Sequence, residues 1–592
     1  MQKHKYIQNW DLNSIFKTSG ELAEHIACTE NMIDSLEAEM DSANIEDPFE
    51  TKKLLDSLGD IRIHLSQAAS FTTCLIAQNP KDPDALSLQG KAAALNGFYD
   101  KSEKLVQSKM ITLTNEAWEQ LLSSKELDDY GFLLNQWRKK AKWQLSEKEE
   151  KLFADLSIDG YHAWAQFYQT LMSSIKISIP LDGTENVMSV GQAINLRSHP
   201  DRFVRKMAHD ALESALEEKE ELFAKILNHI AGFRLEMYKR QGIEDVLEIP
   251  LYENRITKNT LNAMWSSVTK YKAVFTEYLD HKAKLFGSEK LQSYDFWAPV
   301  NSAYQDISFD EAADFIIEHF GAFGTEIQSF ARNAFENGWT EAEERSGKGS
   351  YAFCAGFPLS GESRIFLTYG GRITNVLTLA HELGHAFHNH ALKPVHGLNR
   401  YYPLSLAETA STFSELAILN AAYEKTDNRE DKRFILDEKL KRSVMNFMNI
   451  HARFLFEERF YKERKRGYVP ANRLNRLMQE AMDEAYMGSI DSPSFRSWIW
   501  TPHFYLTRSP FYNFPYTFGY LFSQSIYAAA KTKGPNFEKS YITLLRDSGK
   551  MAVEELVMKY LSEDITKSGF WEKGLQLCAR DAEEFLTLGS QI

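Results

Sequence analysis

The chain has 592 residues, of which 43% are hydrophobic and 25% charged, a composition typical of soluble globular proteins. This length exceeds what one hydrophobic core usually covers, so we expect at least two lobes. The formal net charge of −14 argues against nucleic acid and anionic membranes as partners, because both would require a basic face.

The sparse cysteines indicate a reducing environment. Four cysteines lie far apart and form no C-x-x-C pair, so neither a disulfide framework nor a cysteine zinc site is expected. The first eleven residues lack the apolar core of a signal peptide, and no run reaches the roughly 18 apolar residues that a membrane span needs. We therefore expect a cytoplasmic protein.

The N-terminal part is predicted to be a helical arm. Apolar residues recur at helical spacing in several segments, over residues 19–40, 50–77, 84–108, 115–125 and 130–140. The arm contains no concentrated set of titratable groups, so we interpret it as a scaffold or a cover. Alternation at 175–181 predicts a strand, and we place a domain boundary there, with an N-terminal helical domain over 1–180 and a catalytic domain over 181–592.

Helices are expected to continue through the second domain, over residues 200–238, 259–284 and 309–337. Residues 345–371 are rich in glycine, which predicts a hairpin or small sheet. An exposed edge of this sheet could hold an extended peptide by backbone pairing. The expected fold is therefore mainly α with a small β-sheet.

A metal-binding motif follows this sheet. His381, Glu382 and His385 fit H-E-x-x-H within a helix that we expect over 375–390, with Thr374 as its N-cap. Residues four apart lie on one helical face, so both imidazoles can reach one zinc ion. Glu382 is turned about 100° from His381, which places its carboxylate beside the metal as a general base.

A catalytic zinc usually has three protein ligands, so a third one is needed. His388 is too far along the helix axis and is better interpreted as an outer or packing residue. Glu408 is preferred; it lies on a predicted helix over 405–419 and shares a face with Glu415. Ser405 and Glu408 also fit a capping box, an alternative role for Glu408. Glu415 is expected to orient a ligand histidine, with a surface ion pair as its alternative.

Further helices are predicted over 429–466 and 470–487, and a loop rich in aromatic residues follows. Prolines at 502, 510 and 515 prevent a continuous helix over its first half. If this loop faces the metal, His503 or Tyr512 could donate a hydrogen bond to the oxyanion formed from a peptide carbonyl. The alternative is that these side chains belong to an aromatic core.

Three blocks together resemble the oligoendopeptidase F branch of the thimet-oligopeptidase family of zinc metallopeptidases. They are the H-E-x-x-H segment, the segment 407–415 around Glu408, and the aromatic segment 503–520. The blocks occur in the family's order, and the chain length and helical arm also match. The resemblance therefore covers essentially the whole chain.

The resemblance implies a mainly helical, elongated molecule with a thermolysin-like core at the bottom of a deep channel that admits short unstructured peptides. It implies one zinc ion per chain and general-base catalysis by Glu382. The implied zinc ligands are His381, His385 and Glu408. His503 and Tyr512 are the implied donors to the reacting carbonyl, and the implied substrate contacts are Tyr505, Tyr516 and Tyr520.

The expected function is therefore zinc-dependent hydrolysis of internal bonds in short peptides. One alternative is a metallocarboxypeptidase on a similar helical channel. A second is a helical peptide-binding protein whose zinc is structural and fully coordinated by the protein.

Overall fold

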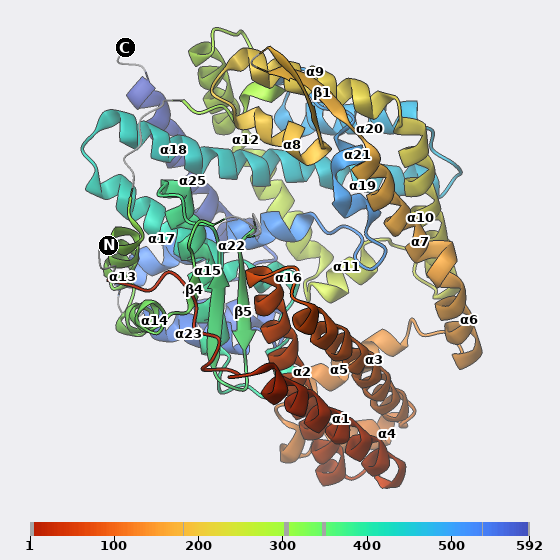
Figure 1. Cartoon of the computed structure of the whole chain (residues 1–592). Coiled ribbons are helices and arrows are strands. Elements are labelled where there is room, and N and C mark those ends of the chain that lie inside the picture. Colours follow the sequence, from red (N-terminus) through yellow and green to blue (C-terminus); the bar gives the residue numbers. More distant parts are fainter. Residues whose placement is uncertain are drawn as a thin grey trace. The chain divides into compact units, whose positions relative to one another are not determined.

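The computed structural model describes residues 5–181, 183–300, 307–345, 348, 351–534 and 537–589. Helices dominate it and the sheets are small, which confirms the predicted fold class (Figure 1). The chain divides into two compact units. The first comprises Met1–Lys142, Tyr304–Ala421 and Ile526–Asp564, and the second comprises Trp143–Ala303, Ala422–Ser525 and Ile565–Ile592. The functional boundary near residue 180 stays a prediction.

The first unit combines the N-terminal helices with the segment that carries the H-E-x-x-H motif. Its elements are α1 (Ser19–Ser42), α2 (Pro48–Gln78), α3 (Pro83–Ile111), α4 (Asn115–Leu122), η1 (Lys125–Leu127), α5 (Gly131–Ala141), α13 (Phe309–Phe320), α14 (Thr325–Glu336), β4 (Thr340–Glu341), β5 (Phe353–Phe357), β6 (Glu362–Phe366), α15 (Ile373–Ala391), η5 (Gly397–Arg400), α16 (Leu404–Ala407), α23 (Phe537–Asp547) and α24 (Val553–Leu561). Most of α17 (Thr409–Lys425) also belongs to it.

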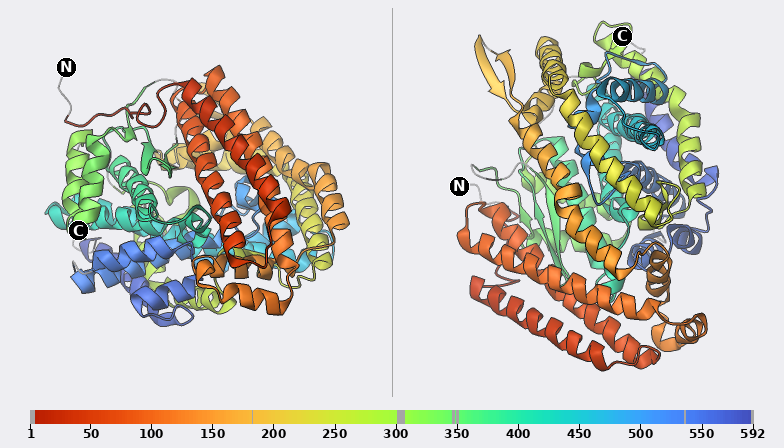
Figure 2. Two further views of the ribbon diagram at one scale, coloured as in Figure 1. Left: turned by 90° about the horizontal axis from the view of Figure 1, so that it is seen from below. Right: turned by 90° about the vertical axis from the view of Figure 1, so that its right-hand side faces the viewer.

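The first three helices begin at residues that satisfy their free N–H groups. The Thr18 side chain accepts from the Glu21 amide, and Asp47 and Asp82 cap α2 and α3 directly before a proline. Figure 2 shows α1, α2 and α3 lying alongside one another, and their apolar faces form a common core. Helices are therefore present in each segment predicted for the arm, over 19–40, 50–77, 84–108, 115–125 and 130–140.

A three-stranded sheet links this core to the metal-binding motif. Its strand order is β4-β6-β5, with β4 parallel and β5 antiparallel to β6. Gly356 pairs with Ser363 in the hairpin, so the predicted hairpin is confirmed for the residues that the structure describes. Ala355, Phe357 and Phe366 join the core of the N-terminal helices, which therefore supports the sheet directly.

The helix that carries the motif starts two residues before the expected position. Gly371, at φ +75°, turns the chain after the sheet, and α15 begins at Ile373. The Asn375 side chain accepts from the amides of Gly370 and Arg372, each at 3.1 Å. The prediction of Thr374 as the N-cap is wrong, because Arg372 holds the N-cap position and Thr374 already lies inside the first turn.

The second unit is almost entirely helical. Its elements are α6 (Glu147–Ser157), η2 (Ile158–His162), α7 (Ala163–Ser174), β1 (Ile177–Leu181), β2 (Thr184–Met188), α8 (Val190–Asn195), η3 (Leu196–Ser198), α9 (Arg202–Glu217), α10 (Glu220–Arg240), α11 (Glu248–Glu253), α12 (Lys258–Leu285), β3 (Leu291–Gln292), η4 (Ser293–Asp295), α18 (Arg429–Val444), η6 (Met445–Asn449), α19 (Ile450–Arg464), α20 (Ala471–Tyr486), β7 (Ile490–Asp491), α21 (Ser497–Trp500), η7 (Pro502–Tyr505) and α25 (Ser568–Gly589), with the first part of α22 (Phe514–Lys533).

A buried ion pair lies inside this second unit. Lys282 of α12 bonds Asp437 of α18 at 2.9 Å, and the Tyr278 hydroxyl donates to the same carboxylate at 2.6 Å. Both charges are thus paired in the interior, as burial requires.

Among the helices that the structure describes, none combines the length and apolar character needed to span a membrane.

Candidate active site

Helix α15 brings two imidazoles together on one face. His381 and His385 are one turn apart, and their Nε2 atoms lie 3.2 Å from each other. Both side chains are about three quarters buried, with 24% and 23% of their surface exposed. Burial lowers the pKa of His385 to about 4, which favours the neutral imidazole that a metal ion binds.

Glu408 approaches the same two nitrogen atoms from the next helical segment. Its Oε2 lies 3.3 Å from the His381 Nε2 and 3.6 Å from the His385 Nε2. The Ser411 hydroxyl donates to this oxygen at 2.8 Å, which fixes the carboxylate. The segment predicted as a helix over 405–419 therefore brings the Glu408 carboxylate to His381 and His385, as expected.

The segment around Glu408 is not one continuous helix. The expected helix over 405–419 is interrupted at Glu408, which ends α16 with φ −89° and ψ 4° before α17 begins at Thr409. Pro403 holds the N-cap position of α16, so Ser405 lies inside the helix and not at the start that a capping box requires.

The three donor atoms fit a tetrahedral metal ion. Zinc binds imidazole nitrogen and carboxylate oxygen at about 2.0–2.2 Å, which separates neighbouring ligand atoms by roughly 3.3 Å. The observed separations of 3.2, 3.3 and 3.6 Å match one face of such a tetrahedron. The group formed by His381, His385 and Glu408 could therefore hold a metal ion.

Gly384 allows the two helical segments to approach each other. A β-carbon at this position would lie 2.4 Å from the Ala410 carbonyl oxygen and 2.5 Å from the Ser411 Cα, both on the backbone of α17. Glu408 lies just before these residues. The close contact at Gly384 thus sets how near its carboxylate comes to the histidines.

We expect Gly384→Ala to lower the free energy of unfolding by ~1–3 kcal/mol, because α17 must move to admit the methyl group. Metal affinity should fall as well, since Glu408 moves with this segment. Gly90→Ala is the matched control: Gly90 lies in α3 with open space around it, so alanine should stabilise the protein by up to ~1 kcal/mol. Denaturant unfolding and zinc dialysis measure both effects. Equal stabilisation by the two substitutions would contradict the packing argument.

Glu415 of α17 holds the other side of the His381 ring. Its Oε1 lies 2.5 Å from His381 Nδ1, so this nitrogen donates to the carboxylate, and Nε2 is the ring atom that faces Glu408. Burial opposes protonation of His381, but the hydrogen bond and charge of Glu415 outweigh it and raise its pKa to about 9. This contact supports the expected orienting role of Glu415.

Replacing Glu415 by Gln should weaken metal binding by ~10–100-fold, because the amide loses the charge that makes His381 a strong ligand. The fold should remain, since Gln has nearly the same shape. Glu326→Gln removes a carboxylate that pairs with His390 at 3.3 Å near the end of α15, and it should leave metal affinity unchanged. Competition with a metal-sensitive dye gives both affinities. Unchanged affinity in Glu415→Gln would exclude this role.

Glu382 lies beside the candidate metal site without belonging to the group of donor atoms. Only 6% of the residue is exposed, and burial raises its pKa to about 7. Its side chain lines a cavity of about 600 Å³ that His381, His385 and Glu408 also line. A carboxylate with such a pKa can accept and return a proton near neutral pH.

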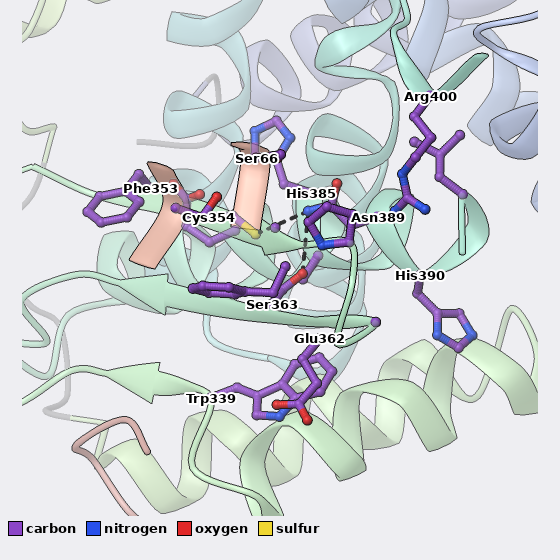
Figure 3. A pocket seen from close by; sticks show the side chains of 18 of the residues that line it. Ser66, Trp339, Phe353, Cys354, Glu362, Ser363, His385, Asn389, His390 and Arg400 are labelled. Carbon is purple, nitrogen blue, oxygen red and sulfur yellow. Dashed lines mark hydrogen bonds between the residues drawn. The ribbon is translucent and has the colours of Figure 1, made fainter. Parts of the chain in front are cut away.

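The rest of this cavity is lined by the sheet and by distant helices. β5 forms one wall, and Figure 3 shows Asn389 beside Cys354 and Ser363, with its amide 3.9 Å from the Cys354 Sγ and 3.4 Å from the Ser363 Oγ. Asn389 lies one turn after His385, so helical spacing could have placed it here. No pattern in the sequence indicated Ser66, Ser70 or Arg400, which come to the cavity from α2 and η5.

His388 is fully buried and faces away from the donor atoms. Its Nε2 lies 3.0 Å from the Ser548 hydroxyl and 3.2 Å from the Leu545 carbonyl, and its ring stacks on Tyr402. Burial lowers the pKa of this imidazole to about 3, so it stays neutral. These contacts connect α15 to α23, in line with a packing residue.

The predicted residues of the aromatic segment lie in the second unit. His503, Tyr512 and Tyr516 form a half-buried cluster with ring centroids 5.0–5.8 Å apart. The Asn513 Oδ1 lies 2.8 Å from the His503 Nδ1, and burial lowers the pKa of His503. Their contact with a reacting carbonyl stays a prediction.

Two other tyrosines of this segment lie in the interior. Tyr505 is 1% exposed and stacks on Tyr168 with centroids 3.8 Å apart. Tyr520 is 6% exposed, and its hydroxyl lies 2.9 Å from the Ser443 Oγ. Such burial leaves little of either ring for a substrate to contact, so the structure gives no support to their predicted role.

The fold and the site together are those of a helical metallopeptidase. The model of Peptidase family M3 matches residues 195–577, and that of Oligopeptidase F matches residues 109–177. The chain belongs to peptidase family M3 and is a metalloendopeptidase.

Relatives and solved structures agree with this assignment over nearly the whole chain. An oligoendopeptidase F homologue of Lactococcus lactis is 23% identical over 93% of this chain and 92% of its own length. Oligopeptidase PepF of Bacillus subtilis is 24% identical over 75% of this chain and 67% of its length. Oligoendopeptidase F from Enterococcus faecium superposes with a TM-score of 0.67 at 18% identity, covering 97% of this chain and 98% of that one. A peptidase structure from Chlamydophila abortus reaches 0.86 at 20% identity, covering 98% of each.

Proposed function

We propose that this protein is a zinc-dependent oligoendopeptidase that hydrolyses internal bonds of short, unstructured peptides. The observation that carries the proposal is the convergence of His381, His385 and Glu408 within 3.2–3.6 Å, beside a buried Glu382. The relatives that are named oligoendopeptidases support the same reaction.

The chain's residues divide the work at this site. His381, His385 and Glu408 would hold the zinc, and Glu415 would orient His381. When bound, zinc supplies Lewis-acid chemistry that polarises a peptide carbonyl and acidifies water. Glu382 takes the proton from the attacking water and then delivers it to the leaving amine. Its burial keeps the pKa near the value at which both transfers are effective.

The sheet edge offers a binding surface for the substrate backbone. β5 is the last strand in the order β4-β6-β5, and residues 352–354 and 356–358 of this strand and its flanks line the cavity. An extended peptide can pair with such an edge, whereas a folded domain cannot enter a cavity of about 600 Å³. We assign oxyanion stabilisation to His503 and Tyr512, and substrate contact to Tyr516. A cytoplasmic location remains part of the proposal, and the four free cysteines support it.

Metal analysis combined with peptide cleavage tests the proposed activity. A quenched fluorescent peptide with both ends blocked should be cleaved by the zinc-loaded enzyme, and a chelator should stop cleavage without unfolding the protein. A metallocarboxypeptidase would leave the blocked peptide intact. If the zinc were structural, the zinc-loaded protein would not cleave the peptide, and the chelator would unfold it.

A further inference from the structure

A second cavity lies within the second unit. It has a volume of about 400 Å³ and is bordered by α8, η3, η6, α19, α20 and α21. Figure 1 shows α8, α20 and α21 in the same region of this unit. Among its lining residues that the structure describes there is no Asp, Glu, Lys or His, but there are two arginines, Arg197 and Arg453. The charge lining this cavity is therefore entirely positive.

Arg197 has no counter-ion in the described part of the chain. Its Nε is buried without a hydrogen-bond partner, and its guanidinium lies 5.8 Å from the centre of the Trp500 ring. Burial lowers its pKa. Glu213 is the acid whose charge reaches Arg197, but it forms its ion pair with Arg496, and burial raises the pKa of Glu213 to about 7.

Among the residues that the structure describes, Arg453 likewise has no acidic partner. Its one hydrogen bond among the described residues is a long one, 3.3 Å from Nη1 to the Asn513 Oδ1. Burial, with a smaller contribution from the positive charge of Arg197, lowers the pKa of Arg453 to about 10. Two like charges on half-buried side chains thus face one cavity, although a charge withdrawn from water normally requires a partner of opposite sign.

An anion would neutralise the charges of the two arginines, and the residues that line the cavity indicate which kind of anion fits. Guanidinium groups bind carboxylate and phosphate oxygens in a planar, two-pronged geometry. A volume of about 400 Å³ admits a small organic molecule as well as a single inorganic ion. Trp297, Phe296 and Met482 line the remaining wall, which suits an apolar body attached to the charged group.

We propose that this cavity binds a small organic molecule through a carboxylate or phosphate group held between Arg197 and Arg453. None of the three candidate metal ligands lines this cavity and the proposal does not depend on the zinc assignment, although Arg453 shares Asn513 with His503. Two sources supply such a group: a peptide product with a free C-terminal carboxylate, and a phosphorylated metabolite. Both offer negatively charged oxygen atoms to the arginines.

Thermal unfolding and titration calorimetry of the zinc-loaded protein in Tris chloride test the proposal. The probes are inorganic phosphate, phenyl phosphate, and N-acetylphenylalanine with its uncharged amide. We expect phosphate or N-acetylphenylalanine to raise Tm above that in chloride at equal ionic strength, and the amide to have no effect. Preference for N-acetylphenylalanine identifies a peptide end, and preference for phenyl phosphate identifies a phosphorylated ligand.

Arg197→Met separates this site from anions bound elsewhere, including at the metal. The variant should bind the preferred probe at least ~10-fold more weakly. It should also have a higher Tm than the native protein when no oxyanion is present, because a half-buried charge without a counter-ion among the described residues is removed. Arg473→Met is the matched control, since Arg473 pairs on the surface with Glu463 and Glu480. It should keep the native response.

Equal responses in the native protein, Arg197→Met and Arg473→Met would overturn the proposal. So would a lower Tm of Arg197→Met without oxyanion, because it would assign the arginine a structural role. If Arg197→Met does not fold, Arg453→Gln replaces it: the amide can still donate to Asn513, and loss of the probe response is again expected. A native response in this variant would equally contradict the proposed site.

Discussion

Glu382→Gln is expected to lower kcat by at least ~10²–10⁴-fold while leaving one metal ion per chain. The amide cannot accept the proton of the attacking water or deliver one to the leaving amine. Because Glu382 is not among the three converging donor atoms, metal binding should not depend on its charge. Gln also fills the buried space that Glu occupies, so unfolding should change little.

The measurement combines kcat and KM for a quenched fluorescent peptide with the metal-to-chain ratio of the same sample. Glu362→Gln is the matched control, since Glu362 lines the same cavity but bonds Arg364 at 2.9 Å. It should retain most of the activity. Full activity in Glu382→Gln would remove this residue from the mechanism, whereas loss of metal would show that it acts as a ligand.

The motif helix was predictable because all its determinants are local. His381, Glu382 and His385 follow helical spacing, and a glycine turn before them marks the start of the helix. The first three helices of the N-terminal arm were equally visible, since each begins at a capping residue and has one apolar face. Local spacing and capping therefore decide most of the helical fold.

Helix interruptions were harder to predict. The expected helix over 200–238 is broken between α9 and α10, at Glu218 and Lys219, where good helix formers give no signal. The break between α13 and α14 coincides with Gly321 and Gly324, which the prediction passed over. At Glu408 the interruption has a consequence for the site, because this residue leaves the helical conformation where its carboxylate meets the histidines.

Other parts of the site depend on contacts that no local pattern encodes. In the sequence, Gly384 is only a residue of low helix propensity. Its role becomes visible in the structure, where the backbone of α17 packs against it. Ser66 and Ser70 reach the cavity from a helix some three hundred residues earlier in the chain. The lack of an acidic partner for Arg197 and Arg453 among the described residues likewise becomes visible only in the structure, because composition does not distinguish one arginine from another.

Glu408→Ala is expected to release the metal ion. The substitution removes the only carboxylate among the three donor atoms, and two imidazoles remain. Loss of an outer partner of a metal ligand costs ~10–100-fold in affinity, and loss of a ligand itself should cost more. Activity should then fall in proportion to metal occupancy and be restored in part by excess zinc.

Equilibrium dialysis against zinc gives the stoichiometry, and circular dichroism verifies the fold. Ser411→Ala is the matched control: it removes the hydroxyl that donates to the Glu408 Oε2 at 2.8 Å but keeps the carboxylate, so affinity should fall by ~10–100-fold and by less than in Glu408→Ala. Stoichiometric zinc in Glu408→Ala would limit Glu408 to supporting the backbone between α16 and α17. A different third ligand would then be required, and the proposed coordination would be wrong, although the family assignment would stand.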